Sequence, residues 1–353
     1  MSRILAVAPV LPEHAYDQSE ITAMLADLIT SDDRQRAVLE RFHSSSGIAR
    51  RYTALPIDRY RELTSFEEAN DLWIREGTML AARAVSAALA SAGLAPADVD
   101  YLFFTSVTGV AAPSIDTRLV PLLGLRPDVK PVPSFGLGCV AGASGIARVH
   151  DYLAGHPRDV ALVVSVELCS LTLQRDDASV ANFVASGLFG DGAAAVVMVG
   201  DERAAELGLP GPEVVDTRSV LYPDSASVIG WDIGGTGLRI VLTAAVADTI
   251  DANIGIDVDG LLADNGLTRA DVDSWMAHPG GPRVLEAFER GLGLERAQLE
   301  PSWRLLDAVG NLSSSSVLHL LADQFDQPAG AHGMLFALGP GVTSEYVLMR
   351  WAG

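Results

Sequence analysis

The sequence contains little that would support a disulfide or a metal site. Its 353 residues include only two cysteines, Cys139 and Cys169, and no Cys-x-x-Cys pair. It also contains no apolar run long enough to span a membrane and no signal-peptide pattern, which indicates the reducing cytoplasm. We therefore expect no structural disulfide. Because no Cys/His spacing fits zinc or an iron–sulfur cluster, we expect no metal.

Basic residues are also scarce. There are 25 Lys and Arg residues against 45 Asp and Glu, a formal net charge of -20. A nucleic acid or an anionic membrane would require a basic face, so neither is an expected partner, although a local basic patch for an anionic ligand is not excluded. With 49% hydrophobic residues, the chain can bury a large core.

Short apolar segments alternate with amphipathic ones along the chain. The expected strands lie at 4–10, 99–106, 161–166, 193–199, 275–278 and 343–351, and the expected helices at 18–42, 66–93, 243–266, 283–292 and 313–325. This alternation predicts an α/β protein with buried mixed sheets and helices on their faces.

A weak internal repeat is also present. A glycine turn followed by an apolar strand occurs at 189–199 and again at 338–349, and the acidic, Pro/Gly-rich stretch 200–213 separates the two regions. We therefore predict two similar halves, 1–205 and 206–353.

Cys139 lies in a run of small residues. The segment 134–145 reads SFGLGCVAGASG, and it places the cysteine between glycines where a strand is expected to give way to a helix. Free N–H groups and the dipole at the helix N-terminus are expected to lower the pKa of the thiol. This pattern fits a nucleophile, but a small buried packing residue is the alternative.

A thiol nucleophile needs a base and a group that stabilises an oxyanion. His278 ends an apolar strand just before Pro-Gly-Gly-Pro, and Asn311 lies in Gly-Asn-Leu-Ser-Ser before an apolar helix. Each residue has an ordinary alternative, because His278 could be a turn residue and Asn311 a helix cap.

Taken together and in this order, these motifs resemble the type III polyketide synthases, the chalcone-synthase-like enzymes of the thiolase superfamily. The matching segments are 135–142, 188–195, 278–282, 310–314 and 339–341. The resemblance implies a thiolase-like fold of two pseudo-duplicated αβαβα halves with buried mixed sheets. It also implies a homodimer that uses acyl-CoA and malonyl-CoA as substrates without a cofactor of its own.

The resemblance implies that Cys139, His278 and Asn311 form a catalytic triad reached by a coenzyme A tunnel. Cys139 would carry the acyl starter as half of a thiolate–imidazolium pair. His278 and Asn311 would stabilise the enolate formed when malonyl-CoA loses carbon dioxide.

Three positions are implied to shape the entrance to the cavity. Phe189 matches the gatekeeping phenylalanine, although it could be a core aromatic at a turn. Ile240 matches a second gatekeeper that is aromatic in plant members, so the constriction is expected to be wider. Leu338 replaces an aromatic residue, and its backbone N–H could still serve an oxyanion.

Four further positions are implied to concern the cavity walls. Ala112 replaces a methionine that reaches into the partner subunit's cavity, and Trp231 replaces a glycine. The bulky Trp231 ring would block an aromatic starter, while small residues elsewhere could admit an aliphatic one. Thr172 and Cys169 match wall positions, and Cys169 is either a second thiol near the site or a buried spectator.

Coenzyme A contacts are implied at the positions of a cationic trio and at a glycine turn. Arg41 matches one member of the trio, while Val38 and Ser45 stand at its two lysine positions. Arg50 and Arg51 could compensate, since guanidinium groups suit phosphates; solvated helix arginines are the alternative. Gly280 and Gly281 are the other expected contacts.

The resulting function is an acyltransferase that performs iterative decarboxylative condensation. An aliphatic acyl-CoA starter would be extended with malonyl-CoA and cyclised to a resorcinol, a pyrone or a related aromatic. The alternatives are a malonyl-CoA-primed, tetrahydroxynaphthalene-type synthase and a single-round ketoacyl synthase III. Hydroxymethylglutaryl-CoA synthase is disfavoured because no glutamate is evident near the cysteine. A non-catalytic acyl-binding partner would not need Cys139, His278 and Asn311 together.

Overall fold

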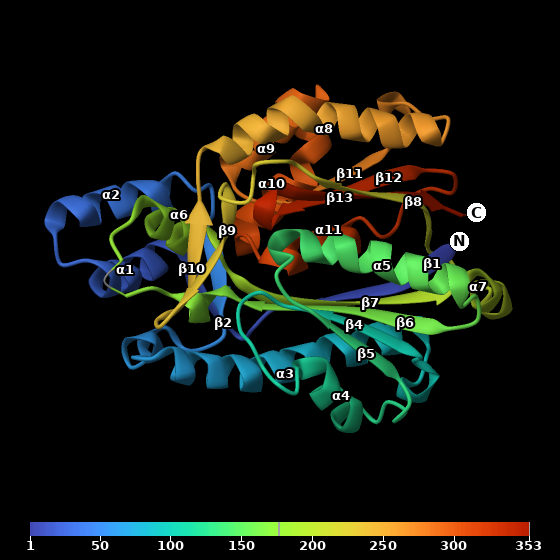
Figure 1. Cartoon of the computed structure of the whole chain (residues 1–353), viewed down its shortest axis with the longest axis horizontal. Coiled ribbons are helices and arrows are strands. Elements are labelled where there is room, and N and C mark those ends of the chain that lie inside the picture. Colours follow the sequence, from blue (N-terminus) through green and yellow to red (C-terminus); the bar gives the residue numbers. More distant parts are fainter. Residues whose placement is uncertain (176, 353) are drawn as a thin grey trace.

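A nine-stranded mixed sheet runs through the molecule. The computed structural model describes residues 1–175 and 177–352. In spatial order the strands are β11 (Ser274–Ala277), β12 (His332–Gly339), β13 (Thr343–Trp351), β8 (Pro212–Leu221), β1 (Ser2–Val10), β7 (Asp191–Gly200), β6 (Val160–Leu168), β4 (Tyr101–Thr105) and β5 (Lys130–Ser134). β1 and β8 pair only at Ser2 and Arg3, so the strands form two layers that are joined at one end (Figure 1).

The two layers repeat one pattern of strand pairing. In the first layer β4 runs parallel to β6, β6 antiparallel to β7, and β7 antiparallel to β1. In the second, β11 runs parallel to β12, β12 antiparallel to β13, and β13 antiparallel to β8. β7 and β13, the strands after the two glycine turns, therefore occupy equivalent positions, and the predicted duplicated α/β fold is confirmed.

Helices cover both sheet layers and fill the space between them (Figure 1). Two helices lie between the layers. α5 (Ala141–Gly155) packs on β6 and β13, and α11 (Ser316–Asp323) packs on β1 and β7. The outer face of the first layer carries α3 (Phe66–Ala92) and α4 (Ile115–Leu123), and that of the second carries α8 (Ala245–Asp264), α9 (Pro282–Leu292) and α10 (Glu300–Val309). The remaining helices are α1 (Gln18–Ile29), α2 (Asp33–Ser44), α6 (Val180–Leu188) and α7 (Asp201–Leu207).

The residues in the central strands suit burial on both faces. Every residue of β6 and β7 is buried, and both strands consist largely of valine and alanine. A strand covered on both faces has no need of alternating polar residues, so it reads as one apolar run. This explains why these strands were easy to predict from the sequence.

Two predicted segments differ from the structure in organisation. The amphipathic stretch 18–42 is two helices, because Asp32 caps α2 by accepting hydrogen bonds from the N–H groups of Arg34 and Gln35. The acidic stretch 200–213 contains α7, which has acidic residues in its first turn and ends at Gly208 in a left-handed conformation. The connection between the halves is therefore partly helical.

Two short two-stranded antiparallel sheets lie beside the main sheet. In one, β2 (His14–Asp17) pairs with β3 (Arg50–Thr53), and α1 and α2 lie between these strands in the chain. The other is a hairpin of β9 (Ile229–Gly234) and β10 (Gly237–Leu242), in which Trp231 and Ile240 are directly opposite each other, so their side chains share one face. Over the described residues, no helix combines the length and the apolar character needed to cross a membrane.

His319 on α11 provides a test of how this core responds to acid. It is buried, its Nε2 lies 3.0 Å from the carbonyl oxygen of Ala193, and burial lowers its pKa from 6.5 to about 4. As pH falls below 6.5 the unfolded chain takes up this proton first, so stability falls between about pH 6.5 and pH 4. From pH 7 to pH 5 the cost attributable to this side chain is about 2 kcal/mol.

His319→Gln keeps a donor for Ala193 but does not titrate. Its free energy of unfolding, measured with urea at both pH values, is expected to fall less between pH 7 and pH 5 than that of the wild type. Equal decreases in the two proteins would show that His319 is not responsible.

Candidate active site

Cys139 lies on a tight turn between β5 and α5. After Ser134 the chain passes through Gly136 and Gly138, with φ values of 93° and 56°, into a single 3-10 turn at Gly138–Val140. A Cβ on Gly138 would lie 2.5 Å from Cδ of Pro340, so only glycine fits there. This close approach buries Cys139, which is 9% exposed, against the end of the C-terminal layer.

His278 follows β11 and precedes α9. Its N–H donates to the carbonyl oxygen of Phe336 (2.9 Å), and the chain then turns through Gly280 and Gly281, with φ at Gly281 of 138°. The imidazole is 3% exposed, yet neither ring nitrogen has a hydrogen-bond partner within the described parts of the chain. Leaving buried polar atoms unpaired costs folding free energy. Both ring nitrogens can therefore gain a hydrogen bond from a bound ligand.

Asn311 joins the other two residues. Its Nδ2 donates to the carbonyl oxygen of Gly280 (3.4 Å), two residues after His278, and its Oδ1 accepts from the N–H of Ser313 (2.8 Å). Ser313 in turn accepts a hydrogen bond from Cys139 Sγ (3.5 Å) and has a left-handed backbone, with φ of 51°. The structure therefore brings the three predicted residues into one buried cluster.

The expected lowering of the thiol pKa is wrong in this structure. Burial raises the pKa of Cys139 to about 12, partly offset by the hydrogen bond with Ser313. Burial also lowers the pKa of His278 to about 3. The effect of desolvation on the thiol pKa outweighs that of the helix dipole. The thiol is buried in the 3-10 turn before α5 and is not exposed to solvent at the N-terminus of that helix. In both Cys139 and His278, burial thus favours the neutral form.

A carboxyl group does lie near the thiol, contrary to expectation. Glu167 on β6 is buried, and its charge is close enough to raise the pKa of Cys139. Its oxygens accept hydrogen bonds from Val107 N–H, Thr108 Oγ1 and Ser314 Oγ, among others. Burial raises the pKa of Glu167 itself to about 7. The sequence showed no such neighbour because 28 positions separate Glu167 from Cys139.

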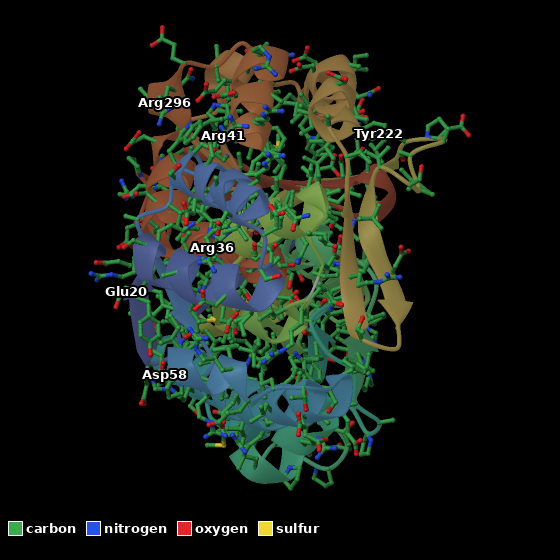
Figure 2. The ribbon with its side chains drawn as sticks, turned by 90° about the vertical axis from the view of Figure 1, so that its left-hand side faces the viewer. Glu20, Arg36, Arg41, Asp58, Tyr222 and Arg296 are labelled. Carbon is green, nitrogen blue, oxygen red and sulfur yellow. The ribbon has the colours of Figure 1, made fainter. Side chains whose placement is uncertain are left out.

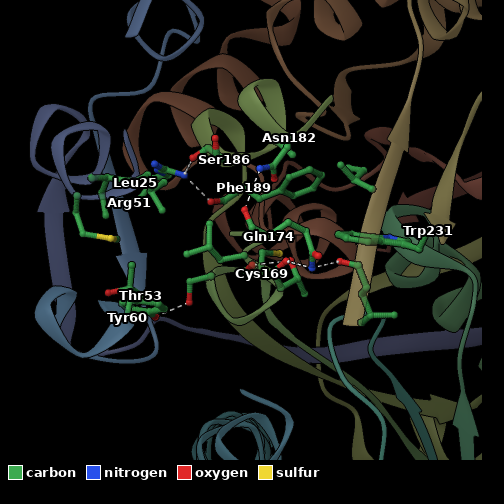
Figure 3. A pocket seen from close by; sticks show the side chains of 18 residues that line it. Leu25, Arg51, Thr53, Tyr60, Cys169, Gln174, Asn182, Ser186, Phe189 and Trp231 are labelled. Carbon is green, nitrogen blue, oxygen red and sulfur yellow. Dashed lines mark hydrogen bonds between the residues drawn. The ribbon is translucent and has the colours of Figure 1, made fainter. Parts of the chain in front are cut away.

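Five of the predicted cavity residues line one partly open cavity of about 60 Å³ (Figure 3). They are Phe189, Trp231, Ile240, Cys169 and Thr172. The rings of Phe189 and Trp231 are 6.4 Å apart between centroids and narrow the space between α6 and the β9–β10 hairpin. Burial raises the pKa of the Cys169 thiol well above its usual value.

Two predicted residues lie elsewhere. Ala112 is exposed in the loop between β4 and α4, and Leu338 is buried near the end of β12. Neither lines the 60 Å³ cavity.

The predicted coenzyme A residues do not share one environment. Arg41 is exposed on α2, on the face that Figure 2 presents to the viewer. Arg50 is exposed and lies 3.6 Å from Asp17 in an ion pair. Arg51, which was expected to assist at the surface, is only 4% exposed, because strand alternation on β3 turns it inward. Arg41 and Arg50 are therefore accessible to a phosphate, whereas Arg51 is not at the surface.

Sequence reasoning missed one residue that shapes the cavity. Gln174 accepts from Thr236 Oγ1 (2.8 Å) and donates to the carbonyl oxygens of Thr236 (3.3 Å) and Leu238 (3.1 Å), which attaches the hairpin to the cavity floor. No local pattern marks a glutamine with this role, since its partners are about 60 residues away.

Comparison with known proteins agrees with this arrangement. The family of chalcone and stilbene synthase N-terminal domains matches residues 1–202, and the corresponding C-terminal domain family matches residues 213–352. The chain is 50% identical to a 1,3,6,8-tetrahydroxynaphthalene synthase of Streptomyces peucetius over 99% of this chain and 93% of the relative. It is 32% identical to an α-pyrone synthesis polyketide synthase-like protein of Mycobacterium tuberculosis, covering 98% of this chain and 90% of that protein.

A solved structure extends the comparison to the fold. The crystal structure of 1,3,6,8-tetrahydroxynaphthalene synthase from Streptomyces coelicolor superimposes with a TM-score of 0.92 at 29% identity, and the match covers 99% of both chains.

The raised thiol pKa makes a prediction about alkylation. In a Cys169→Ala background, the rate at which iodoacetamide modifies Cys139 should still be rising above pH 9, because the thiolate forms only at high pH. Adding Ser313→Ala removes a hydrogen bond that lowers the pKa, so the rate at a given pH should fall. Mass spectrometry of the Cys139 peptide measures both rates. A plateau near neutral pH would instead indicate a preformed thiolate–imidazolium pair.

Proposed function

Because this chain belongs to the chalcone and stilbene synthase family of type III polyketide synthases, we propose that it makes a tetrahydroxynaphthalene-type aromatic from malonyl-CoA alone. The observation that supports this product most is the 50% identity with the Streptomyces peucetius tetrahydroxynaphthalene synthase, which extends over 99% of the chain. A tetrahydroxynaphthalene has no alkyl side chain, so malonyl units can supply all of its carbons.

The first step loads Cys139. The neutral imidazole of His278 takes the thiol proton as the sulfur attacks the thioester carbonyl of malonyl-CoA, and the proton then passes to the departing coenzyme A thiolate. Burial favours the neutral imidazole, which can accept the thiol proton as the sulfur attacks. Arg41 on the exposed face of α2 is the proposed contact for coenzyme A phosphate.

The second step extends the chain. A further malonyl-CoA places its thioester oxygen against His278 and Asn311 Nδ2, loses carbon dioxide and leaves an enolate. The enolate carbon attacks the acyl group on Cys139, the sulfur leaves, and the chain is longer by two carbons. The bond from Asn311 Nδ2 to Gly280 is long at 3.4 Å, so the amide can turn to an incoming oxygen at little cost.

Exclusion of water supports this chemistry. The enolate reacts with any proton donor, and Phe189 and Trp231 narrow the space beside the cluster. Cyclisation then follows within the closed site.

An aliphatic starter giving a resorcinol or a pyrone is the second candidate. The 32% identity with the α-pyrone-associated protein favours it, as do Trp231 and the small Ala112 at positions implied to shape the pocket. We prefer malonyl priming because the 50% identity with the tetrahydroxynaphthalene synthase supports it more strongly.

Labelled malonyl-CoA tests the choice between these starters. Incubated alone with the purified protein, it is expected to give the major aromatic product, and adding hexanoyl-CoA, decanoyl-CoA or palmitoyl-CoA should divert little label. Liquid chromatography with mass spectrometry measures the products. If the main product appeared only with an alkyl-CoA, malonyl priming would be refuted and the second candidate supported.

Substitution of Cys139 tests the covalent mechanism. Cys139→Ala should abolish both the acyl adduct seen by intact-protein mass spectrometry and the product, while the circular dichroism spectrum is unchanged. Cys139→Gln should retain decarboxylation of malonyl-CoA, because His278 and Asn311 remain. Cys169→Ala is the matched control for loss of a buried thiol and should keep the adduct. Chain extension by either Cys139 variant would falsify the mechanism.

A further inference from the structure

The β9–β10 hairpin lies beside the main sheet as a two-stranded sheet of its own. On its inner face Trp231 and Ile240 line the partly open cavity and are only half-buried. A two-stranded hairpin is at best marginally stable in water by itself. The position of this hairpin therefore depends on the contacts that it makes at its two ends.

The base of the hairpin is anchored by apolar packing. Ile229 begins β9 and Leu242 ends β10, and both pack against the buried core of the C-terminal layer. Next to them, Thr243 N–H donates to the carbonyl oxygen of Val228 (3.0 Å), which joins the two chain segments that enter and leave the hairpin. The base is therefore the end about which the hairpin can turn.

Gln174 attaches the other end of the hairpin, its turn. The buried Gln174 accepts a hydrogen bond from Thr236 Oγ1 (2.8 Å) and donates to the carbonyl oxygens of Thr236 (3.3 Å) and Leu238 (3.1 Å). Among residues 1–175 and 177–352, no other hydrogen bond joins residues 229–242 to the rest of the chain. One amide group thus supplies the polar attachment of the turn.

Gln174 also joins the hairpin to the facing wall of the cavity. Its Nε2 donates to the carbonyl oxygen of Thr172 (3.1 Å), and its backbone carbonyl oxygen accepts from Asn182 Nδ2 on α6 (3.1 Å). Asn182, Phe189 and Trp231 line the same cavity as Gln174 (Figure 3). These bonds therefore help to keep the ring centroids of Phe189 and Trp231 6.4 Å apart across it.

We propose that the β9–β10 hairpin is a gate over this cavity and that Gln174 is the positioning residue that holds it closed. When the turn swings outward on the base, the three hydrogen bonds between Gln174 and the hairpin break and Trp231 moves away from Phe189. Water that enters can replace those bonds, so the closed and open forms differ little in hydrogen bonding. The gate concerns access to the cavity and does not depend on which starter the protein uses.

The cavity that the gate covers adjoins the catalytic cluster. Cys169 lines it and lies close enough to Cys139 for the charge of that residue to raise the pKa of Cys169. On another wall, Phe189 forms a backbone bridge with Asn311. A closed gate therefore keeps bulk water away from the space beside Cys139, whereas an open gate admits water and solutes to it.

Alkylation of Cys169 measures how often the gate opens. In a Cys139→Ala background, N-ethylmaleimide should modify Cys169 at least about tenfold faster in Gln174→Met than when Gln174 is intact, because methionine fills a similar space without any of the bonds. Mass spectrometry of the Cys169 peptide measures both rates at one pH. Equal rates in the two proteins would overturn the proposal.

Two further variants bracket this result. Thr236→Val removes only the bond to Gln174 Oε1, so its alkylation rate should lie between those of Gln174→Met and the parent protein. Gln327→Met is the matched control, because Gln327 Nε2 also donates to a carbonyl oxygen, that of Gln324, but Gln327 does not line the cavity. Its rate should equal that of the parent. An equal acceleration in Gln327→Met would overturn the assignment to Gln174.

Hydrogen exchange distinguishes a gate from a general loss of stability. In Gln174→Met the amides of residues 229–242 should exchange at least about tenfold faster, because an unsupported hairpin frays, while those of β6 and β7 keep their rates. Equal acceleration in all three regions would mean that Gln174 only stabilises the fold. Unchanged exchange in the hairpin would mean that apolar contacts such as those of Leu238 hold the turn. Either result would overturn the proposal. Circular dichroism checks folding, and Thr236→Val carries both tests if Gln174→Met does not fold.

Discussion

The candidate site depends on one short backbone pairing between the two halves of the chain. Asn311 N–H donates to Leu188 O (2.8 Å), and Gly190 N–H donates to Asn311 O (2.9 Å). The segments approach so closely that a Cβ on Gly190 would lie 2.4 Å from the carbonyl oxygen of Val309, and one on Gly310 would lie 2.8 Å from that of Leu188. The glycines in Phe-Gly-Asp-Gly and Gly-Asn-Leu-Ser-Ser are thus a packing requirement, and the pairing sets Phe189 beside Asn311.

Burial of this junction determines its electrostatics. Cys139, His278 and Glu167 are all at most 9% exposed, and in each the pKa shifts toward the neutral form mainly because of desolvation. Hydrogen bonds offset part of this cost at Cys139 and Glu167 but not at His278. Burial therefore favours the neutral forms of these three groups, and a charged form of any of them would need new partners to stabilise it.

Much of this arrangement was accessible from the sequence, for identifiable reasons. The apolar runs of β6 and β7 mark doubly covered strands, and motifs that join the halves carry Cys139, His278 and Asn311. The direction of the thiol pKa shift was not accessible, because it depends on how deeply the turn at Gly138 is covered by Pro340. The burial of Arg51 was also not accessible from the sequence. Arg50 and Arg51 are neighbours on β3, and strand alternation exposes the first side chain and buries the second. The local sequence pattern identifies the reactive groups. Their burial and the direction of their pKa shifts depend on packing between residues that are far apart in the sequence.

The width of the cavity discriminates only weakly between starters. Its hairpin side presents Trp231 and Ile240, which limit width but accept any apolar or planar group. Size alone separates related chains weakly, since a methylene contributes only about 1–3 kcal/mol. The width set by Phe189 and Trp231 therefore limits the size of the acyl chain more than it selects the chemistry of the starter.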